Sequence, residues 1–187
     1  MTQTESCTTK VSTTASAETR FDHVSLYRES GLGVVCRATD TSLNREVALK
    51  IIKSELLHDR EAIEQFEGEA EITGRLVHPG IAPVYSTGKT PDGNPFYAMQ
   101  FVEGIDFIDE IDAFYRKRHP SFDGVAFSRL VLTFASACRT IAYAHSRGII
   151  HRNITPQNIR VGKFNEVFVL DWGLAISVEH NAKASAH

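Results

Sequence analysis

The chain has 187 residues, 42% of them hydrophobic and 23% charged, and its formal net charge is −3. This apolar content is enough for one domain or two small lobes, and the weak negative charge gives no electrostatic reason to expect binding to nucleic acid or to an anionic membrane. Cys7, Cys36 and Cys138 are widely spaced, which argues against a disulfide framework or a zinc site and fits a reducing cytoplasm. No apolar run approaches the roughly 20 residues that cross a bilayer, and the N-terminus lacks the hydrophobic core of a signal peptide. The sequence therefore predicts a cytoplasmic protein without a membrane or nucleic-acid partner.

The chain begins with a segment that is rich in Thr and Ser. Residues 1–20 contain almost no large apolar side chain, so burial cannot offset the entropy of ordering them. We expect a disordered tail there and a second polar tail at 178–187.

Residues 21–53 have the pattern of three antiparallel strands. FDHVSLY and VVCRA are two β-rich runs around a glycine turn, and a second turn at 40–44 leads into REVALKIIK. In this third run, alternation places Lys50 on the same face as Ala48 and Ile52. Because Lys50 then lies within an apolar strand, it needs an anionic partner.

The following helix offers that partner. Between Asp59 and Leu76, side chains spaced by three and four residues form an inward stripe, and Glu69 is its one acid. A carboxylate among apolar side chains is costly unless it is paired, so we expect an ion pair between Lys50 and Glu69. The alternative is that Glu69 lies exposed at the edge of the stripe.

Further runs complete an α+β arrangement. Residues 81–85 and 96–102 predict two more strands around a turn at 90–93, which gives a five-stranded antiparallel sheet with one helix. Two helices are expected at 107–118 and about 126–146, and a broad apolar face on the second indicates a core helix. That face consists of Phe127, Leu130, Val131, Phe134, Cys138, Ile141 and Ala142.

Two polar loops follow, and a hairpin is expected to hold them together. Gly148 is placed to end the second helix, Ile149 and Ile150 form a short strand, and 159–161 can pair with 167–170 across a turn. The first loop carries His151, Arg152, Asn153 and Asn158, and the second carries Asp171, Trp172 and Gly173. Both loops follow strand-like runs, so the sequence predicts a site for metal and phosphate at one rim.

These motifs resemble those of protein kinases, especially bacterial eukaryotic-like serine/threonine kinases, over residues 20–177. The segments that carry the resemblance are REVALK, EAEITGRLVHPGIAPVY, PFYAMQFVEG, AYAHSRGIIHR, HRNITPQN and VLDWGLA. The resemblance implies a kinase-like fold, with an N-lobe at 21–103, a hinge near Gly104 and a partial, mainly helical C-lobe at 104–177.

The resemblance also implies ATP and Mg²⁺ as cofactors. Lys50, paired with Glu69, would hold the α- and β-phosphates, and Asn158 and Asp171 would bind Mg²⁺. The residues expected to line the rest of the nucleotide site are Gly31, Gly33, Val35, Ala48, Met99, Val102, Asp106 and Arg160. In this set Met99 is the gatekeeper, although an ordinary core role explains it equally well, and Asp106 is a possible ribose contact.

The sequence departs from the family pattern in the catalytic loop. Asn153 stands where the family has its catalytic Asp, so the proton acceptor is missing, and Thr155 stands where many members carry Lys. Arg160 lies where the family has an apolar residue beneath adenine. It either stacks on the base or fills the slot and pairs with an acid.

The phosphate loop departs from the pattern as well. Arg28 and Ser30 replace the first two glycines, and the absence of a side chain is what allows the closest approach of backbone to phosphate. Ser30 is the milder change, and Arg28 either weakens the loop or adds positive charge to it.

The resemblance implies an activation segment, an A-P-E motif and further helices, none of which is found between Gly173 and His187. We therefore expect a truncated domain in which part of the 127–142 face lacks cover, and a protein partner or a second copy to bind there. Three functions stay open: a pseudokinase or nucleotide-binding regulator, a slow serine/threonine kinase, and a non-catalytic remnant or scaffold.

Overall fold

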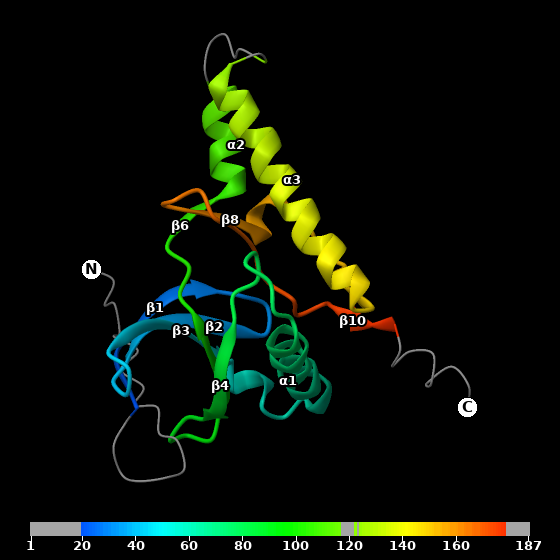
Figure 1. Ribbon diagram of the computed structural model, residues 1–187. Helices are drawn as coiled ribbons and strands as arrows, with labels where there is room; N and C mark the ends of the chain where they lie inside the picture. The colour runs from blue at the N-terminus through cyan, green and yellow to red at the C-terminus, as the bar shows by residue number, and fades with distance from the viewer. Residues whose placement is uncertain (1–19, 117–121, 123, 179–187) are drawn as a thin grey trace. The chain divides into compact units, whose positions relative to one another are not determined.

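The computed structural model describes residues 20–116, 122 and 124–178 (Figure 1). The tails expected at 1–20 and 178–187 lie outside these residues except for Arg20 and Val178. Contacts divide the chain into two compact units: the first contains Met1–Gly74 and Pro83–Phe101, and the second contains Arg75–Ala82 and Val102–His187. The division therefore falls two residues before the expected lobe boundary, and the segment 75–82 joins the second unit.

The first unit is an antiparallel sheet with one helix (Figure 1). In spatial order, its strands are β1 (Phe21–Glu29), β2 (Gly33–Asp40), β3 (Arg45–Ile52), β5 (Pro95–Gln100) and β4 (Val84–Lys89). Helix α1 spans Arg60–Arg75. It begins there because Asp59 Oδ1 accepts the backbone N–H groups of Glu61 and Ala62, at 2.9 and 3.2 Å. The five strands and the helix confirm the architecture that the sequence predicts.

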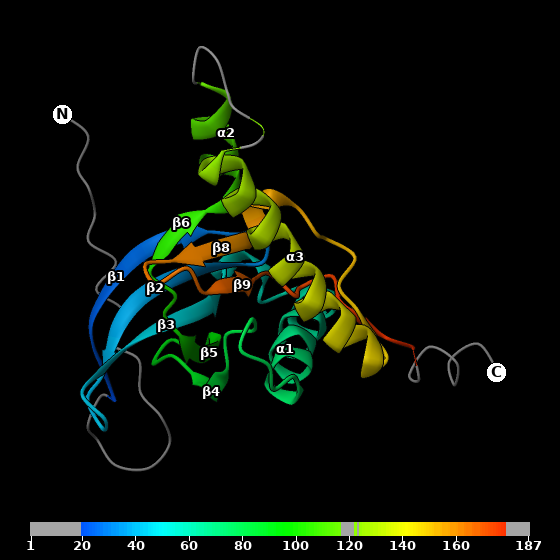
Figure 2. The same ribbon diagram turned by 45° about the horizontal axis from the view of Figure 1, so that its top comes forward.

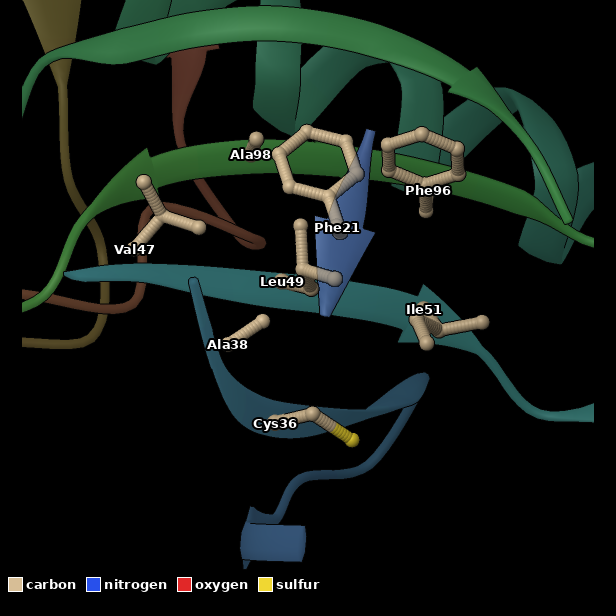
Figure 3. Close-up of a cluster of buried hydrophobic side chains, with 8 residues drawn as sticks. All are labelled: Phe21, Cys36, Ala38, Val47, Leu49, Ile51, Phe96 and Ala98. Carbon is tan, nitrogen blue, oxygen red and sulfur yellow. The ribbon is translucent and has the colours of Figure 1, made fainter. Parts of the chain in front are cut away.

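Both faces of the sheet are buried at β3. On one face, eight side chains from β1, β2, β3 and β5 gather into a cluster (Figure 3). They are Phe21, Cys36, Ala38, Val47, Leu49, Ile51, Phe96 and Ala98. On the other face, Phe66 and Ala70 of α1 pack against Ile52 and Tyr97. The period-two alternation of β3 is thus confirmed, and Lys50 lies on the face that α1 covers.

The strand predicted at 81–85 is wrong in its bounds. β4 begins only at Val84, and β5 ends at Gln100 instead of residue 102. The preceding residues bond elsewhere: Ile81 N–H closes a turn onto the His78 carbonyl at 3.0 Å, and the Gly80 carbonyl accepts Val169 N–H at 2.8 Å. The segment before β4 is therefore held within the second unit and not in the sheet.

The second unit combines two helices with short ladders (Figure 2). Its elements are β6 (Gly104–Asp106), α2 (Phe107–Tyr115), α3 (Val125–Ser146), β7 (Ile149–Ile150), β8 (Ile159–Gly162), β9 (Val167–Val169) and β10 (Ile176–Ser177). β6, β8 and β9 form one sheet, β7 pairs with β10, and α3 packs against β9 and β7. α2 is shorter than predicted, and residues 117–118 of that prediction lie outside the described residues.

The glycine expected near a hinge is part of the β6–β8 ladder. Gly104 pairs with Gly162, and a Cβ at Gly104 would lie 2.1 Å from the Val161 carbonyl oxygen. Its φ of 158° is open to glycine at little cost. Gly104 is therefore required by the close approach of two strands within the second unit.

The fully buried face of α3 is not the predicted core face, and part of the predicted 127–142 face is exposed, as expected for a domain that lacks cover there. The residues that α3 buries are Thr133, Ala137, Thr140 and Ala144. In the predicted face, by contrast, Val131 is 48% exposed and Phe134 is 59% exposed. Small residues line the packed side because the chain approaches closely there: a Cβ on Gly80 would lie 2.1 Å from Thr140 Oγ1. Large apolar side chains are left on the other side of the helix.

By length and composition alone, α3 could cross a membrane, contrary to the sequence-based expectation that no segment approaches this limit. One such helix is weak evidence, because the core helix of a soluble protein meets the same criteria. In α3 the apolar run is interrupted by Arg129 and Arg139.

Candidate functional site

The first unit contributes a buried ion pair. Lys50 Nζ donates to both carboxylate oxygens of Glu69 at 2.6 Å, and each residue is only 4% exposed. β3 supplies the lysine and α1 the glutamate, as strand alternation and helical spacing predict. Two-point contact in a dry environment gives a well-defined geometry, and loss of either partner would leave a buried charge alone. The alternative of an exposed Glu69 is wrong.

The expected phosphate loop is a tight turn between β1 and β2. Both the backbone N–H and the hydroxyl of Ser30 donate to the Gly33 carbonyl, at 2.8 and 2.9 Å, so Ser30 closes the turn on itself. A Cβ at Gly33 would lie 2.5 Å from the Ile51 carbonyl, whereas a Cβ at Gly31 would meet nothing within 4 Å. Gly33 is therefore needed for packing of the sheet, and Gly31 is the position where the backbone is open.

The other expected contacts of the first unit lie along the sheet. Val35 pairs with Lys50, and Ala48 pairs with Met99. Ala48 is 3% exposed, while Met99 is half-buried and packs against the cluster around Phe66. Met99 therefore contributes to the core, which is the ordinary role that the sequence also allows for it.

In the second unit, four hydrogen bonds join the two polar loops. They link His151 to Leu170, Asn153 to Asp171, Leu170 to Asn158, and Arg152 to Leu174. Trp172 adds packing, because its ring centroid lies 4.5 Å from that of His151 and its Nε1–H donates to the Val169 carbonyl at 3.1 Å. The two loops are thus one connected structure, as the hairpin predicts.

His151 anchors this structure from a fully buried position. Its Nδ1 accepts the Asn153 backbone N–H at 3.2 Å, and its Nε2 lies 3.1 Å from the Leu170 carbonyl oxygen. A neutral imidazole has one donor and one acceptor, so the proton is on Nε2. Burial lowers the pKa of His151 below its usual 6.5, although the Leu170 carbonyl and the Asp171 charge oppose the shift. His151 is therefore a neutral, structural side chain at pH 7.

Asn153 lies at the centre of the expected metal site. Its Nδ2 donates to Asp171 Oδ2 at 3.2 Å, and its backbone carbonyl accepts Asn158 Nδ2 at 2.9 Å. The structure thus brings Asn153, Asn158 and Asp171 together through hydrogen bonds. Within the described residues, no group of three or more His, Cys, Asp or Glu side chains is arranged to hold a metal. The side-chain oxygen atoms here belong to one carboxylate, Asp171, and two amides, Asn153 and Asn158.

Two residues of these loops have left-handed backbone conformations. Arg152 has φ 65° and Asp171 has φ 61°. A non-glycine residue in this region costs of order 1–3 kcal/mol, and it persists only where surrounding contacts hold it. The hydrogen bonds between the loops supply those contacts, which concentrates backbone strain at the candidate site.

Arg160 pairs with an acid. Its Nε and Nη2 donate to Asp106 Oδ1 at 3.1 and 2.6 Å, and its Nη1 donates to the Val102 carbonyl at 3.3 Å. Arg160 is 4% exposed, and strand register places it directly opposite Asp106. Of the two alternatives that the sequence leaves open, the structure has the guanidinium paired with a carboxylate. Arg160 is therefore bonded to two other residues expected to contact nucleotide, Asp106 and Val102.

Thr155 has a structural place as well. It precedes a short 3-10 helix, Pro156–Asn158, and its carbonyl accepts Asn158 N–H at 3.0 Å. Unlike the Lys that many kinases carry at this position, its side chain brings no positive charge to the loop.

Sequence reasoning missed the side-chain bond between Asn153 and Asp171. The two residues are 18 positions apart, and their types are compatible with many other partners. The signal that could have found the bond is the exchange of an acid for an amide next to a second acid, because an amide can donate where a carboxylate cannot.

A family model described as the protein kinase domain matches residues 29–187. The chain belongs to this family. The serine/threonine-protein kinase PknD of Protochlamydia amoebophila is 37% identical over 158 residues, which cover 82% of this chain and 16% of that kinase. PknD of Chlamydia caviae is 37% identical over 165 residues, covering 86% and 17%, and PknD of Chlamydia pneumoniae is 35% identical over 161 residues, covering 84% and 17%.

These matches confirm the resemblance to bacterial serine/threonine kinases, and with it the kinase-like α+β fold. The chain spans about a sixth of the length of these kinase relatives. The activity of the whole relatives therefore does not transfer to this chain.

Proposed function

We propose that this kinase-family chain is a pseudokinase-type regulator, which binds nucleotide weakly and does not transfer phosphate at a useful rate. The observation that carries the proposal is the side-chain hydrogen bond from Asn153 to Asp171. An amide cannot accept the proton of a substrate hydroxyl as a carboxylate does, and this amide already donates to Asp171. A positioned general base is typically worth roughly 10²- to 10⁴-fold in rate.

Transfer of labelled phosphate from ATP, to the chain itself and to a mixed Ser/Thr peptide pool, tests the proposal. We expect turnover far below the roughly 1–100 per second usual for kinases. Asn153→Asp is the matched variant, since it restores the carboxylate with almost no change in size, and it should transfer phosphate faster than the natural chain. Turnover of the natural chain in the usual range would overturn the proposal.

Features that favour nucleotide binding are retained in both units. Lys50 is held by Glu69 for a phosphate contact, and Asp171 and Asn158 offer oxygen atoms of the kind that Mg²⁺ prefers. These residues fit Mg·ATP chemically, and the metal would supply charge neutralisation of the phosphates. The intact Lys50–Glu69 pair is also the observation that favours the second candidate, a slow but real kinase.

The Arg160–Asp106 pair opposes nucleotide binding. A base or ribose that used the Val102 carbonyl or Asp106 would have to compete with an almost fully buried guanidinium. We therefore expect Mg·ATP to bind with a Kd of about tens of micromolar or weaker, which at millimolar nucleotide still stabilises the fold by roughly 2–3 kcal/mol.

Calorimetry separates these contributions. Arg160→Leu should bind Mg·ATP several-fold more tightly than the natural chain, because it frees Asp106 and the Val102 carbonyl. Lys163→Leu is a suitable control, since Lys163 is an exposed cation on the turn that follows β8 and pairs with Glu103 instead. Absence of binding heat in both the natural chain and Arg160→Leu would favour the non-catalytic scaffold.

A protein partner or a second copy is the third part of the proposal. Its support is the apolar groove between α2 and α3, which has a volume of about 280 Å³. The groove is lined by Phe107, Ile111, Tyr115, Leu130, Val131 and Phe134. Exposed apolar surface of this kind is typical of an interface.

A further inference from the structure

The side chain of Asn153 donates a hydrogen bond to the residue that the kinase pattern assigns to the metal. The Nδ2–Oδ2 distance to Asp171 is 3.2 Å, and both residues lie in the second unit and are half-buried. A carboxylate that accepts an amide N–H has one oxygen oriented and partly neutralised by a fixed dipole. This is part of what a bound cation would otherwise do.

The backbone around Asn153 is held independently of this side-chain bond. Its N–H donates to His151 Nδ1 and its carbonyl accepts Asn158 Nδ2, at 3.2 and 2.9 Å. A change of side chain at 153 therefore leaves the backbone contacts in place. An aspartate there would put a second carboxylate within hydrogen-bond distance of Asp171, where two like charges repel unless a cation lies between them.

We propose that Asn153 is a positioning residue that holds Asp171 in its strained, left-handed conformation without a divalent cation. The proposal rests on the assignment of Asn153 and Asp171 to the site under Proposed function. A divalent cation that bound Asp171 through Oδ2 would have to displace the amide hydrogen. The loop that carries Asp171 is thus held by contacts of this chain, and Mg²⁺ binding through Oδ2 would cost the hydrogen bond from Asn153.

Thermal melting of the purified chain in EDTA and in 10 mM Mg²⁺, without nucleotide, tests this role. The natural chain should have the same melting temperature in both conditions, within about 1 °C. Asn153→Asp should melt roughly 2–4 °C lower in EDTA, a shift on the scale of a single lost interaction in a chain of this size, and Mg²⁺ should restore it. Asn153→Asp combined with Asp171→Asn should lose the Mg²⁺ response, because only one carboxylate is left.

Direct binding of Mn²⁺, followed by electron paramagnetic resonance, gives a second readout that does not depend on melting. Asn153→Asp should bind Mn²⁺ at least about tenfold more tightly than the natural chain, since a second carboxylate joins the site. The proposal is overturned if the natural chain gains as much from Mg²⁺ as Asn153→Asp does, or if the two bind Mn²⁺ equally.

The positioning role of Asn153 and the pseudokinase assignment can fail separately, and the measurements tell the two failures apart. Phosphate transfer by the natural chain, together with a melt that does not respond to Mg²⁺, would remove the pseudokinase assignment and keep the positioning role. A strong Mg²⁺ response without phosphate transfer would remove the positioning role and keep the pseudokinase assignment.

Discussion

His151 links the stability of the second unit to pH. Its pKa is lowered from 6.5 in the folded chain, chiefly by burial, so the unfolded chain binds the proton more readily. The stabilising contribution is complete above pH 6.5 and is lost as the pH falls toward the folded pKa. We predict that the free energy of unfolding declines between pH 7.5 and pH 5.5.

Urea unfolding at several pH values measures this decline. His151→Gln should flatten the curve, whatever its effect on stability at pH 7.5. His145→Gln, at an exposed position in the last turn of α3, is the control for removal of one histidine. An unchanged pH slope in His151→Gln would show that another group is responsible.

Breaking the Lys50–Glu69 pair should lower the free energy of unfolding strongly, whereas replacing both residues with apolar ones should change it little. Loss of one partner from a buried pair typically costs about 3–5 kcal/mol, whereas replacement of both by apolar residues is often neutral or stabilising. We predict that Glu69→Leu alone destabilises the chain strongly and that Lys50→Met with Glu69→Leu recovers most of the loss. Equal, additive losses in a denaturant-based double-mutant cycle would contradict this.

At the residue scale, the sequence predicts those side-chain contacts that follow from the periodicity of single helices and strands. The alternation of β3 and the stripe of α1 are sufficient to pair Lys50 with Glu69. The bonds of Asn153 and Arg160 depend on which of several acids each side chain reaches, and this is set by register and loop geometry. For Arg160 the sequence left two alternatives for that reason.

At the scale of elements, the close approach of Gly80 to α3 can be tested by substitution. A Cβ on Gly80 would lie 2.1 Å from Thr140 Oγ1 and 3.0 Å from the Val167 carbonyl. We predict that Gly80→Ala destabilises the chain by about 1–3 kcal/mol, the usual range for overpacking, and that Thr140→Ala relieves part of the loss.

Gly68→Ala is the matched control for this substitution. A Cβ on Gly68, within α1, would meet nothing within 4 Å, so the change should stabilise the helix by up to about 1 kcal/mol. Denaturant unfolding measures both variants. If Gly80→Ala were as stable as the natural chain, α3 would have room to shift, and its close approach would not be a packing constraint.

The length and position of α3 follow from the sequence, but its buried face does not. Periodicity marks Val131 and Phe134 as core because they are large and apolar. The packed face instead carries Thr133, Ala137, Thr140 and Ala144, because the close approach at Gly80 admits only small side chains. A long-range steric constraint of this kind has no local signature in the sequence.

At the scale of the whole molecule, the exposed apolar side of α3 predicts self-association. Val131, Leu132 and Phe134 are 48%, 65% and 59% exposed. If about 400 Å² of apolar surface stays exposed to water, the chain lacks on the order of 10 kcal/mol of burial free energy, which is comparable with the net stability of a domain. We expect the purified chain to associate at micromolar concentration, and Leu132→Glu with Phe134→Glu to reduce this. A natural chain that light scattering shows to be monomeric, with a melting temperature independent of concentration, would contradict the expectation.

The initial rate of phosphate transfer from labelled ATP tests most directly whether the whole molecule is a pseudokinase. The reference is the double variant Lys50→Met with Glu69→Leu, which removes the phosphate contact without leaving Glu69 as a buried, unpaired charge. We predict that the natural chain and this double variant have indistinguishable rates, both at least roughly 10²-fold below the 1–100 per second of active kinases. A natural-chain rate within that range, lost in a double variant that is still folded, would contradict the pseudokinase assignment.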